Sequence, residues 1–240
     1  ASGGLETSFD GAYTFAVINK SIANLALTAQ YAKVNDVAAL ADVDVYYAEA
    51  NYLLPMNGFK LGFDANYKGS KTGAALDGLD MEGHYTAGRI SISELAGFGA
   101  SFAYGTTSKS DSVIAGMGNG PTSYTSTMTR GTSTRMMADT DSYLFAATYD
   151  FSKVGIAGLT AIAQYGWTKQ GSTASNLDTA AAALNARTGA ADYTNIAASL
   201  TYAVPSIKGL TTALQYETQE KEVQATSVKT DTNELWFKAG

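Results

Sequence analysis

Apolar residues occupy every second position in several stretches of this chain, and each stretch begins at a glycine that ends a short turn. The pattern recurs in the residue ranges 58–67, 97–104, 158–165 and 209–216. Alternation with a period of two places apolar side chains on one face of a strand and polar side chains on the other. The stretches extend to about ten residues and close on an aromatic residue, which is typical of strands that cross a membrane in a β-barrel. The alternation therefore predicts an all-β fold, a transmembrane antiparallel β-barrel.

Alternation, together with the turn residues that interrupt it, predicts about eleven strands. The predicted hairpins pair 8–18 with 22–33, 43–54 with 59–68, 80–93 with 98–104, 141–151 with 159–168 and 193–204 with 210–217. A last strand at 233–240 has no predicted partner. Long polar connections at 35–42, 69–78, 105–140, 169–192 and 218–232 alternate with the short turns. This asymmetry is typical of outer-membrane barrels, whose short turns face the periplasm.

The apolar phase of each strand holds the residues expected to face lipid. A charge on that face near the middle of the bilayer costs about 2–4 kcal/mol, and the strands avoid it. In the third hairpin, Tyr85 and Ala87 share one phase whereas Ile90 and Ile92 share the other, so a β-bulge near Gly88 is predicted. The lipid-facing set includes Phe59, Leu61, Phe63, Phe145, Tyr149, Leu159 and Leu214, and the aromatic girdles are expected to include Tyr46, Tyr52, Tyr67, Tyr104, Tyr165, Trp167 and Tyr216.

Composition supports a membrane protein that crosses lipid without helices. Hydrophobic residues make up 45% of the chain and charged residues only 16%, against roughly 25% charged in soluble domains. No apolar run approaches the ~18 residues of a transmembrane helix, so the sheet must close to satisfy its backbone groups in hydrocarbon. The absence of cysteine excludes disulfides and thiolate metal sites. A net charge of −6 argues against a nucleic-acid partner.

Residues 1–240 are interpreted as a single β-barrel domain, the C-terminal portion of a longer barrel. Bacterial single-chain barrels have an even number of strands and both termini in the periplasm. If Gly240 ends a strand that runs toward the periplasm, eleven strands place Ala1 outside the cell. An odd number of strands, about seven, is therefore expected upstream, together with a few residues beyond Gly240.

Two strand–turn–strand segments resemble those of the OprD-type outer-membrane porins. They are Tyr149-Asp-Phe-Ser-Lys-Val-Gly-Ile-Ala-Gly-Leu159 and Tyr202-Ala-Val-Pro-Ser-Ile-Lys-Gly-Leu210, and the Tyr- and Ala-rich style resembles the major outer membrane porins of epsilonproteobacteria. The resemblance implies a barrel of about sixteen to eighteen strands in the outer membrane of a Gram-negative bacterium, surrounded by lipid and lipopolysaccharide and often a homotrimer. It also implies a channel for small hydrophilic solutes and ions, with one loop folded inward. The low arginine content does not supply the basic ladder of carboxylate-selective members.

Charged residues on the polar phase are the candidates for pore-lining positions, and their excess of acid predicts a weak cation preference. The connection 105–140 is long enough to be functional. It is interpreted as a constriction loop that turns Arg130 and Arg135 toward the pore, although a mobile surface loop fits the same pattern. The pore-lining candidates are Glu49, Lys60, Asp64, Lys68, Asp80, Glu82, His84, Glu217, Glu234 and Lys238.

Catalysis and metal binding find little support in the sequence. His84 is the only histidine, and no Gly-x-Ser-x-Gly elbow is present, so no catalytic residue, cofactor or metal is expected. The acidic pairs at positions 42/44 and 139/141 could supply oxygen ligands to a divalent cation, but a solvated rim is the favoured reading. The alternative to a porin is a structural or adhesive barrel whose extracellular loops bind a partner.

Overall fold

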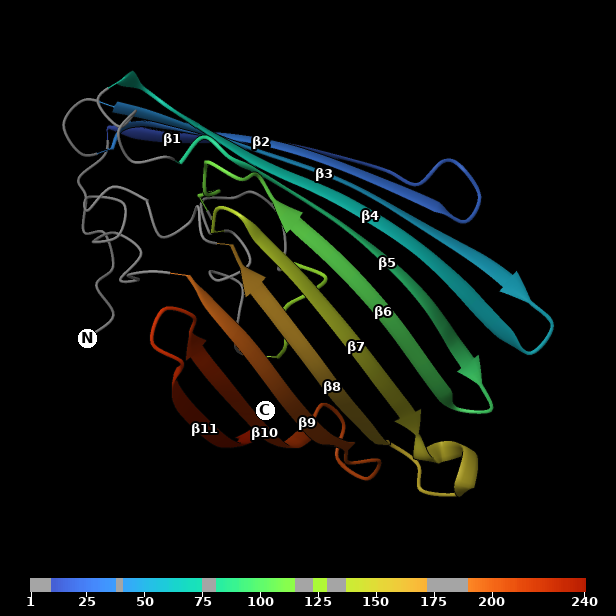
Figure 1. Cartoon of the computed structure of the whole chain (residues 1–240). Helices are drawn as coiled ribbons and strands as arrows, with labels where there is room; N and C mark the ends of the chain where they lie inside the picture. Colours follow the sequence, from blue (N-terminus) through green and yellow to red (C-terminus); the bar gives the residue numbers. More distant parts are fainter. Residues whose placement is uncertain (1–9, 38–40, 75–80, 115–122, 129–136, 172–189) are drawn as a thin grey trace.

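The computed structural model describes residues 10–37, 41–74, 81–114, 123–128, 137–171 and 190–240, and the strands among them form one antiparallel sheet, with a short 3-10 helix at Phe151–Val154. Each strand pairs with the next strand in the chain, so the sheet is a meander without crossovers (Figure 1). The prediction of an all-β chain with about eleven strands is confirmed. The strands are β1 (Gly11–Asn19), β2 (Leu25–Val37), β3 (Ala41–Met56), β4 (Phe59–Thr72), β5 (His84–Leu95), β6 (Phe98–Thr107), β7 (Thr140–Asp150), β8 (Leu159–Gln170), β9 (Ala191–Ala203), β10 (Thr211–Val223) and β11 (Val228–Ala239).

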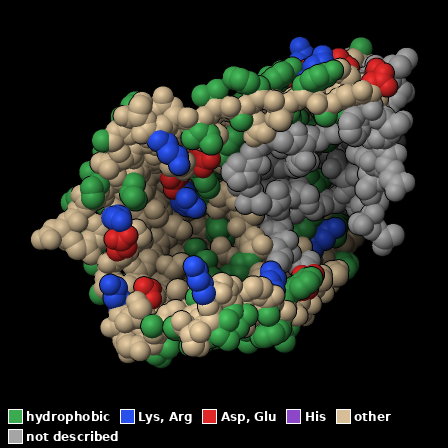
Figure 2. All heavy atoms as spheres, turned by 180° about the vertical axis from the view of Figure 1, so that it is seen from behind, with side chains coloured by type: hydrophobic (Ala, Val, Ile, Leu, Met, Phe, Trp, Pro, Cys, Tyr) green, Lys and Arg blue, Asp and Glu red, His purple; other side chains and the backbone are tan. Residues whose placement is uncertain are grey.

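The sheet curls around a hollow, with β1 and β11 as its two edges (Figure 1). Seen from behind, the molecule is hollowed, and Lys, Arg, Asp and Glu side chains lie along the hollow (Figure 2). We call the face toward the hollow the inner face and the opposite face the outer face. The part of the chain that the structure describes contains no helix long and apolar enough to cross a membrane.

Glycines with positive φ end the short turns that the sequence pattern identified. Gly58, Gly97, Gly158 and Gly209 have φ values of 89°, 89°, 82° and 88°, a left-handed conformation that a residue with a Cβ atom rarely adopts. At Gly97 a Cβ atom would also lie 2.8 Å from the carbonyl oxygen of Asp150. These turns thus need glycine for backbone geometry, and the turns of Gly97 and Gly158 need it for space as well, since a Cβ at Gly158 would lie 2.2 Å from the carbonyl oxygen of Ala203.

The last two strands form a hairpin that the sequence analysis did not predict. The polar range 218–232 was expected to be a long connection, but β10 continues to Val223 and β11 begins at Val228, with only a short turn between them. Their register runs without a shift from Thr212↔Ala239 to Val223↔Val228. The expectation failed because these strand ends are polar on both faces, so the ladder continues where the alternation has ended.

The predicted β-bulge near Gly88 is wrong. The pairing of β4 with β5 runs without a shift from Lys60↔Ser93 to Gly69↔His84, and the described irregularity of β5 lies at its other end, between Ile92 and Leu95. Tyr85 and Ala87 therefore belong to the inner face, and Ile90 belongs to the outer face. The inner pair is apolar because it packs against Val113 and Tyr124 of the connection 105–140.

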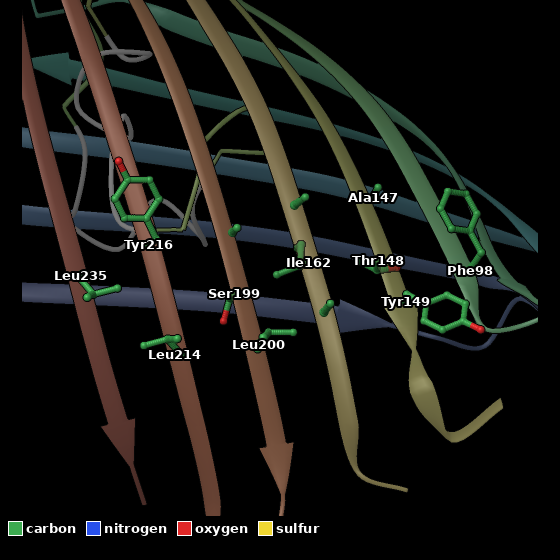
Figure 3. A pocket seen from close by; sticks show the side chains of 13 residues that line it. Phe98, Ala147, Thr148, Tyr149, Ile162, Ser199, Leu200, Leu214, Tyr216 and Leu235 are labelled. Carbon is green, nitrogen blue, oxygen red and sulfur yellow. The ribbon is translucent and has the colours of Figure 1, made fainter. Parts of the chain in front are cut away.

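The outer face carries an apolar band, and its end toward the long connections carries charged residues, among them Asp44, Asp141 and Lys169. Across β7, β8 and β9, Ala147, Ala163 and Ala198 lie side by side in register, and these small side chains leave a shallow trough of about 450 Å³ (Figure 3). All seven residues predicted to face lipid lie on this outer phase of their strands. The trough is bounded by the larger side chains of Phe98, Tyr149, Leu200, Leu214, Tyr216 and Leu235.

Adjacent residues of β4 test the assignment of the two faces. Phe63 is 47% exposed on the outer face, whereas Asp64 points inward and accepts a hydrogen bond from Arg89. We expect Phe63→Arg to destabilise the folded barrel by about 2–4 kcal/mol, because a charge then meets hydrocarbon, and Asp64→Asn to leave assembly nearly unchanged. The folded fraction, measured by heat-modifiable migration on a denaturing gel after refolding into lipid, distinguishes the two. Equal folded fractions for both variants would mean that the faces are assigned the wrong way round.

Candidate functional site

A cluster of charged and amide side chains forms the inner wall of β3, β4 and β5. The strand register places Asn51, Asp64 and Arg89 opposite one another on three successive strands. Glu49 lies two positions from Asn51 and therefore on the same face. We call Glu49, Asn51, Asp64 and Arg89 the inner charged cluster. Because the strands are neighbours in the meander, residues 40 positions apart in the chain meet on one wall.

Hydrogen bonds connect the members of the inner charged cluster. Asn51 Nδ2 donates to Glu49 Oε1 at 3.0 Å and to Asp64 Oδ1 at 2.9 Å. Arg89 Nε donates to Asp64 Oδ2 at 2.8 Å. In this ion pair the Asp64 side chain is 9% exposed and the Arg89 side chain 37% exposed. The guanidinium is thus the more accessible half of the pair.

Tyr124, from the connection 105–140, covers this cluster from the inside. Its hydroxyl donates to Glu49 Oε1 and accepts from Asn51 Nδ2 at 3.0 Å. Its ring lies 4.6 Å from the Arg89 guanidinium carbon, a cation–π geometry. Burial and then the hydrogen bond to Glu49 raise the pKa of the Tyr124 phenol, so the hydroxyl stays protonated and acts as a donor to the carboxylate.

A second cation lies beside the cluster. Lys68 is only 3% exposed, and its ammonium lies 5.6 Å from the centre of the Tyr47 ring. The hydroxyl of Tyr47 in turn donates to Glu49. An ammonium group is costly to bury without compensation, and the aromatic face supplies part of that compensation.

The segment 123–127 crosses the inner side of the sheet and is held by hydroxyl groups. Tyr85 bonds through its hydroxyl to Ser123 and to Thr125, the latter at 3.0 Å, and Thr125 also contacts Ser142 of β7 at 2.8 Å. Thr127 then donates to the fully buried carboxylate of Glu217 on β10. The segment therefore reaches from the wall of β3–β5 to β10, across the hollow. Val113, Ile114 and the segment 123–127 of the connection 105–140 thus contact the inner face of the sheet.

Apolar inner-face residues near the long connections hold another part of the connection 105–140 in place. Ile114 packs against a cluster of Ala32, Val34, Val43 and Val45 on β2 and β3. Burying apolar area stabilises the contact by roughly 25 cal/mol per Å². The sequence carries a signal for it, because Val43 and Val45 occupy the phase that holds Glu49 and Asn51 further along β3, and the charged Asp44 lies between them on the opposite phase.

The structure places most of the predicted pore-lining residues on the inner face. Lys60 lies near the short turns, where its Nζ is 2.5 Å from Glu94 Oε1. Glu217 and Glu234 are opposite each other in register, and Lys238 donates to Gln215 at 2.9 Å. The structure brings Glu49, Asp64 and Lys68 together, and it adds Arg89, which the sequence analysis did not include. The inner-face positions are thus Glu49, Lys60, Asp64, Lys68, Glu217, Glu234 and Lys238.

His84 and Glu82 were also predicted to line the pore, but they are not among these inner-face positions. His84 is on the outer face and stacks on Tyr67, with ring centroids 6.1 Å apart. It was expected on the inner face because it alternates with Asp80 and Glu82, but the pairing of β4 with β5 runs without a shift and places Tyr85 and Ala87 on that face instead. Glu82 precedes β5 and accepts a hydrogen bond from the backbone N–H of Thr72 at 2.9 Å, at the end of the sheet toward the long connections.

The other predicted site residues are three charged side chains and the two acidic pairs considered for a divalent cation. Asp80, Arg130 and Arg135 lie outside the described residues. Within the described part, no group of three or more His, Cys, Asp or Glu side chains could hold a metal ion. Asp42 forms an ion pair with Lys33 at 2.7 Å, and Asp141 accepts from the Tyr104 hydroxyl at 2.7 Å.

Removing one hydroxyl tests whether the 123–127 segment is fastened as described. Tyr85→Phe deletes the partner of Ser123 and Thr125, and we expect a loss of about 1 kcal/mol, which corresponds to about fivefold easier opening of the segment. The rate of trypsin cleavage within 105–140, followed by mass spectrometry on the folded barrel, measures this. Tyr104→Phe is the matched control, because its hydroxyl bonds Asp141 on the outer face. The same acceleration in both variants, or none in Tyr85→Phe, would contradict the assignment.

Of the comparisons with known proteins, the one with solved structures gives matches. No family model matches the chain, and a search of the curated proteins returns no match. The fold is similar to solved structures from Pseudomonas aeruginosa: the outer membrane protein OprD (TM-score 0.74, 15% identity, 95% of this chain and 59% of that chain) and OccK8, also called OprE (TM-score 0.70, 15% identity, 100% and 60%). OpdL from the same organism has a TM-score of 0.68 at 17% identity and covers 96% and 60%.

The chain spans about 60% of the length of these structures. The alignments run over nearly all of its residues, including the eleven strands and the short turns between them. The predicted resemblance is therefore confirmed at the level of the fold. The chain has the β-barrel fold of the OprD-type porins.

Proposed function

We propose that the protein is an outer-membrane porin of a Gram-negative bacterium, through which small hydrophilic solutes and ions diffuse passively. The observation that carries the proposal is the division of the sheet into an apolar outer face and a charged inner face around a hollow (Figure 2). A large barrel with a polar interior is filled with water and conducts solutes that fit its narrowest part. The segment 123–127, which crosses the inner side, is the proposed constriction.

The proposed ion selectivity is a modest preference for cations. The chain carries a net charge of −6, and Glu49 lies at the centre of the inner charged cluster. Carboxylates along a pore raise the local concentration of cations. Arg89 opposes this effect, because its side chain is the more accessible partner of Asp64. The two effects together keep the preference small.

The expected surroundings are the lipid and lipopolysaccharide of the outer membrane, and the expected assembly is a homotrimer. The apolar trough over β7–β9 supports this proposal, because its small side chains would allow a neighbouring subunit to approach closely (Figure 3). Native mass spectrometry from detergent micelles measures the subunit number directly.

Conductance in a planar bilayer tests the proposed channel. We expect stable ohmic steps and a modest shift of the reversal potential toward the cation value in a salt gradient at low ionic strength. The preference should vanish near 1 M salt, where the screening length falls to about 3 Å. A correctly folded barrel that never conducts would reject the porin function and favour a structural or adhesive barrel.

Charge removal at Arg89 tests whether the inner charged cluster sets the selectivity. Arg89→Gln leaves Asp64 without its guanidinium partner, so we expect the cation-to-anion permeability ratio to rise by about twofold or more. Lys33→Gln removes the same charge on the outer face, beside Asp42, and is expected to leave the ratio unchanged. Reversal potentials in a tenfold salt gradient measure both variants. Equal ratios in the two variants would place the selectivity elsewhere.

A further inference from the structure

A second trough lies on the outer face, over β2, β3 and β4. Small side chains form its floor. Ala29 and Ala48 lie opposite each other in register, and Ala50 and Ala65 form the next such pair. Its volume of about 480 Å³ is similar to that of the trough over β7–β9. Since this face meets lipid, an acyl chain can lie in either trough and gain van der Waals contact along its length.

Aromatic rings border the trough over β2–β4 on the side toward the long connections. Tyr31 and Tyr46 are opposite each other in register, with ring centroids 5.5 Å apart. The ring of Tyr67 lies over Gly69, where a Cβ atom would be 3.1 Å from the Tyr67 hydroxyl oxygen, and it stacks on His84 of β5. Tyrosine side chains are typical of the boundary between hydrocarbon and headgroups. The headgroup layer therefore begins at this row.

The next row toward the long connections carries two lysines. Lys33, Asp44 and Lys71 are opposite one another on β2, β3 and β4. Lys33 forms an ion pair with Asp42 at 2.7 Å, and the Asp44 carboxylate accepts a hydrogen bond from the Tyr31 hydroxyl. Lys71 is exposed and takes part in none of the ion pairs among the residues that the structure describes. Its ammonium is thus accessible to an anionic group.

The corresponding row above the trough over β7–β9 has the opposite arrangement of charge. There Lys169 lies in register between Asp141 and Asp192, whereas over β2–β4 one carboxylate lies between two lysines. Glu82, beside the β2–β4 row, accepts a hydrogen bond from the backbone N–H of Thr72 at 2.9 Å. An anionic headgroup is therefore favoured over β2–β4 and disfavoured over β7–β9. The troughs are similar in size, so the charges above them distinguish their occupants.

His84 lies close enough to Lys71 to contact the same headgroup. His84 pairs in register with Gly69, two positions from Lys71 on the same face, so the two are diagonal neighbours, roughly 7–8 Å apart and within reach of long side chains. The imidazole is exposed and carries an N–H in either protonation state. One phosphate can therefore accept a hydrogen bond from each residue.

We propose that the trough over β2–β4 and the cations above it bind one phosphorylated glycolipid of the outer leaflet, the lipid A portion of lipopolysaccharide. The long connections of outer-membrane barrels face the outside, so the headgroup row lies in that leaflet. An acyl chain lies on the alanine floor, and a phosphate accepts hydrogen bonds from Lys71 and His84. The proposal rests on the proposed function, because it requires the outer membrane, but it does not require conduction.

Native mass spectrometry tests the headgroup contacts. The folded barrel in detergent micelles is titrated with lipid A, and the fraction that carries one lipid is measured. Lys169→Gln removes the same charge above the other trough and is the matched control. We expect Lys71→Gln to raise the half-saturating lipid A concentration by about fivefold or more through the loss of charge-assisted hydrogen bonds, and the addition of His84→Gln to raise it further. Lys169→Gln should leave it unchanged.

Filling the trough tests the acyl-chain contact with the headgroup contacts intact. We expect Ala48→Leu to raise the half-saturating lipid A concentration severalfold, because the added side chain occupies the floor, and Ala163→Leu, in the other trough, to leave it unchanged. Inorganic phosphate at the same concentration should not displace the lipid, since it has no acyl chain. Displacement by inorganic phosphate would overturn the lipid site.

Three further results would decide against the site. Equal lipid A binding in Lys71→Gln and Lys169→Gln would overturn it, as would equal binding in Ala48→Leu and the unchanged protein. A dimer that persists at saturating lipid A and is lost in Ala48→Leu would assign the trough to a second copy of the chain. A conducting barrel that retains no lipid A would reject the site alone. A barrel that retains lipid A at Lys71 but never conducts would reject the proposed channel and leave the site intact.

Discussion

The structure depends on the requirement that backbone amide and carbonyl groups find partners where no water is available. The meander satisfies this requirement strand by strand, because each strand from β1 to β11 pairs with its neighbour in the chain. Once the ladder is formed, the period of two divides every strand into two independent columns of side chains. In β4, Phe63 and Tyr67 belong to the outer column, and Asp64 and Lys68 belong to the inner one. The chemistry of each face can therefore vary without disturbing the other.

The inner column of β3 changes from apolar to polar residues along the strand. Near the long connections, Val43 and Val45 of β3 are buried against Ile114, so this end of the column is apolar. Four residues further along the same face, Glu49 and Asn51 hold charges and hydrogen bonds in the hollow. The connection 105–140 meets both parts of this face, through Ile114 at the apolar end and through the Tyr124 hydroxyl at Glu49. A strand that lines a hollow and also supports an inward segment thus carries both types of residue on one face.

Local periodicity explains which features could be predicted from the sequence. The faces of Phe63 and Asp64 followed from their immediate neighbours. The faces of His84 and Arg89 could not be predicted in this way. Tyr85 and Ala87 are apolar although they lie on the inner face, so the sequence pattern suggests that they face outward. They are apolar because they contact Val113 and Tyr124, which are distant in the chain. The hairpin of β10 and β11 was hidden for a different reason. Its ends are polar on both faces, so pairing persists there without a hydrophobic pattern.

The geometry of the inner charged cluster means that net charge alone does not decide what a solute experiences. Asn51 is neutral and donates to both Glu49 and Asp64, so it holds two carboxylates close together without cancelling their charge. Arg89 neutralises Asp64 from one side and exposes its guanidinium against the ring of Tyr124. In the proposed channel, a solute on the side of Glu49 would meet an anionic field, and one on the side of Arg89 would meet a cationic one. Tyr124 joins the two sides, because its hydroxyl bonds to Glu49 and its ring lies against the Arg89 guanidinium, so the segment 123–127 is fastened between the two charges.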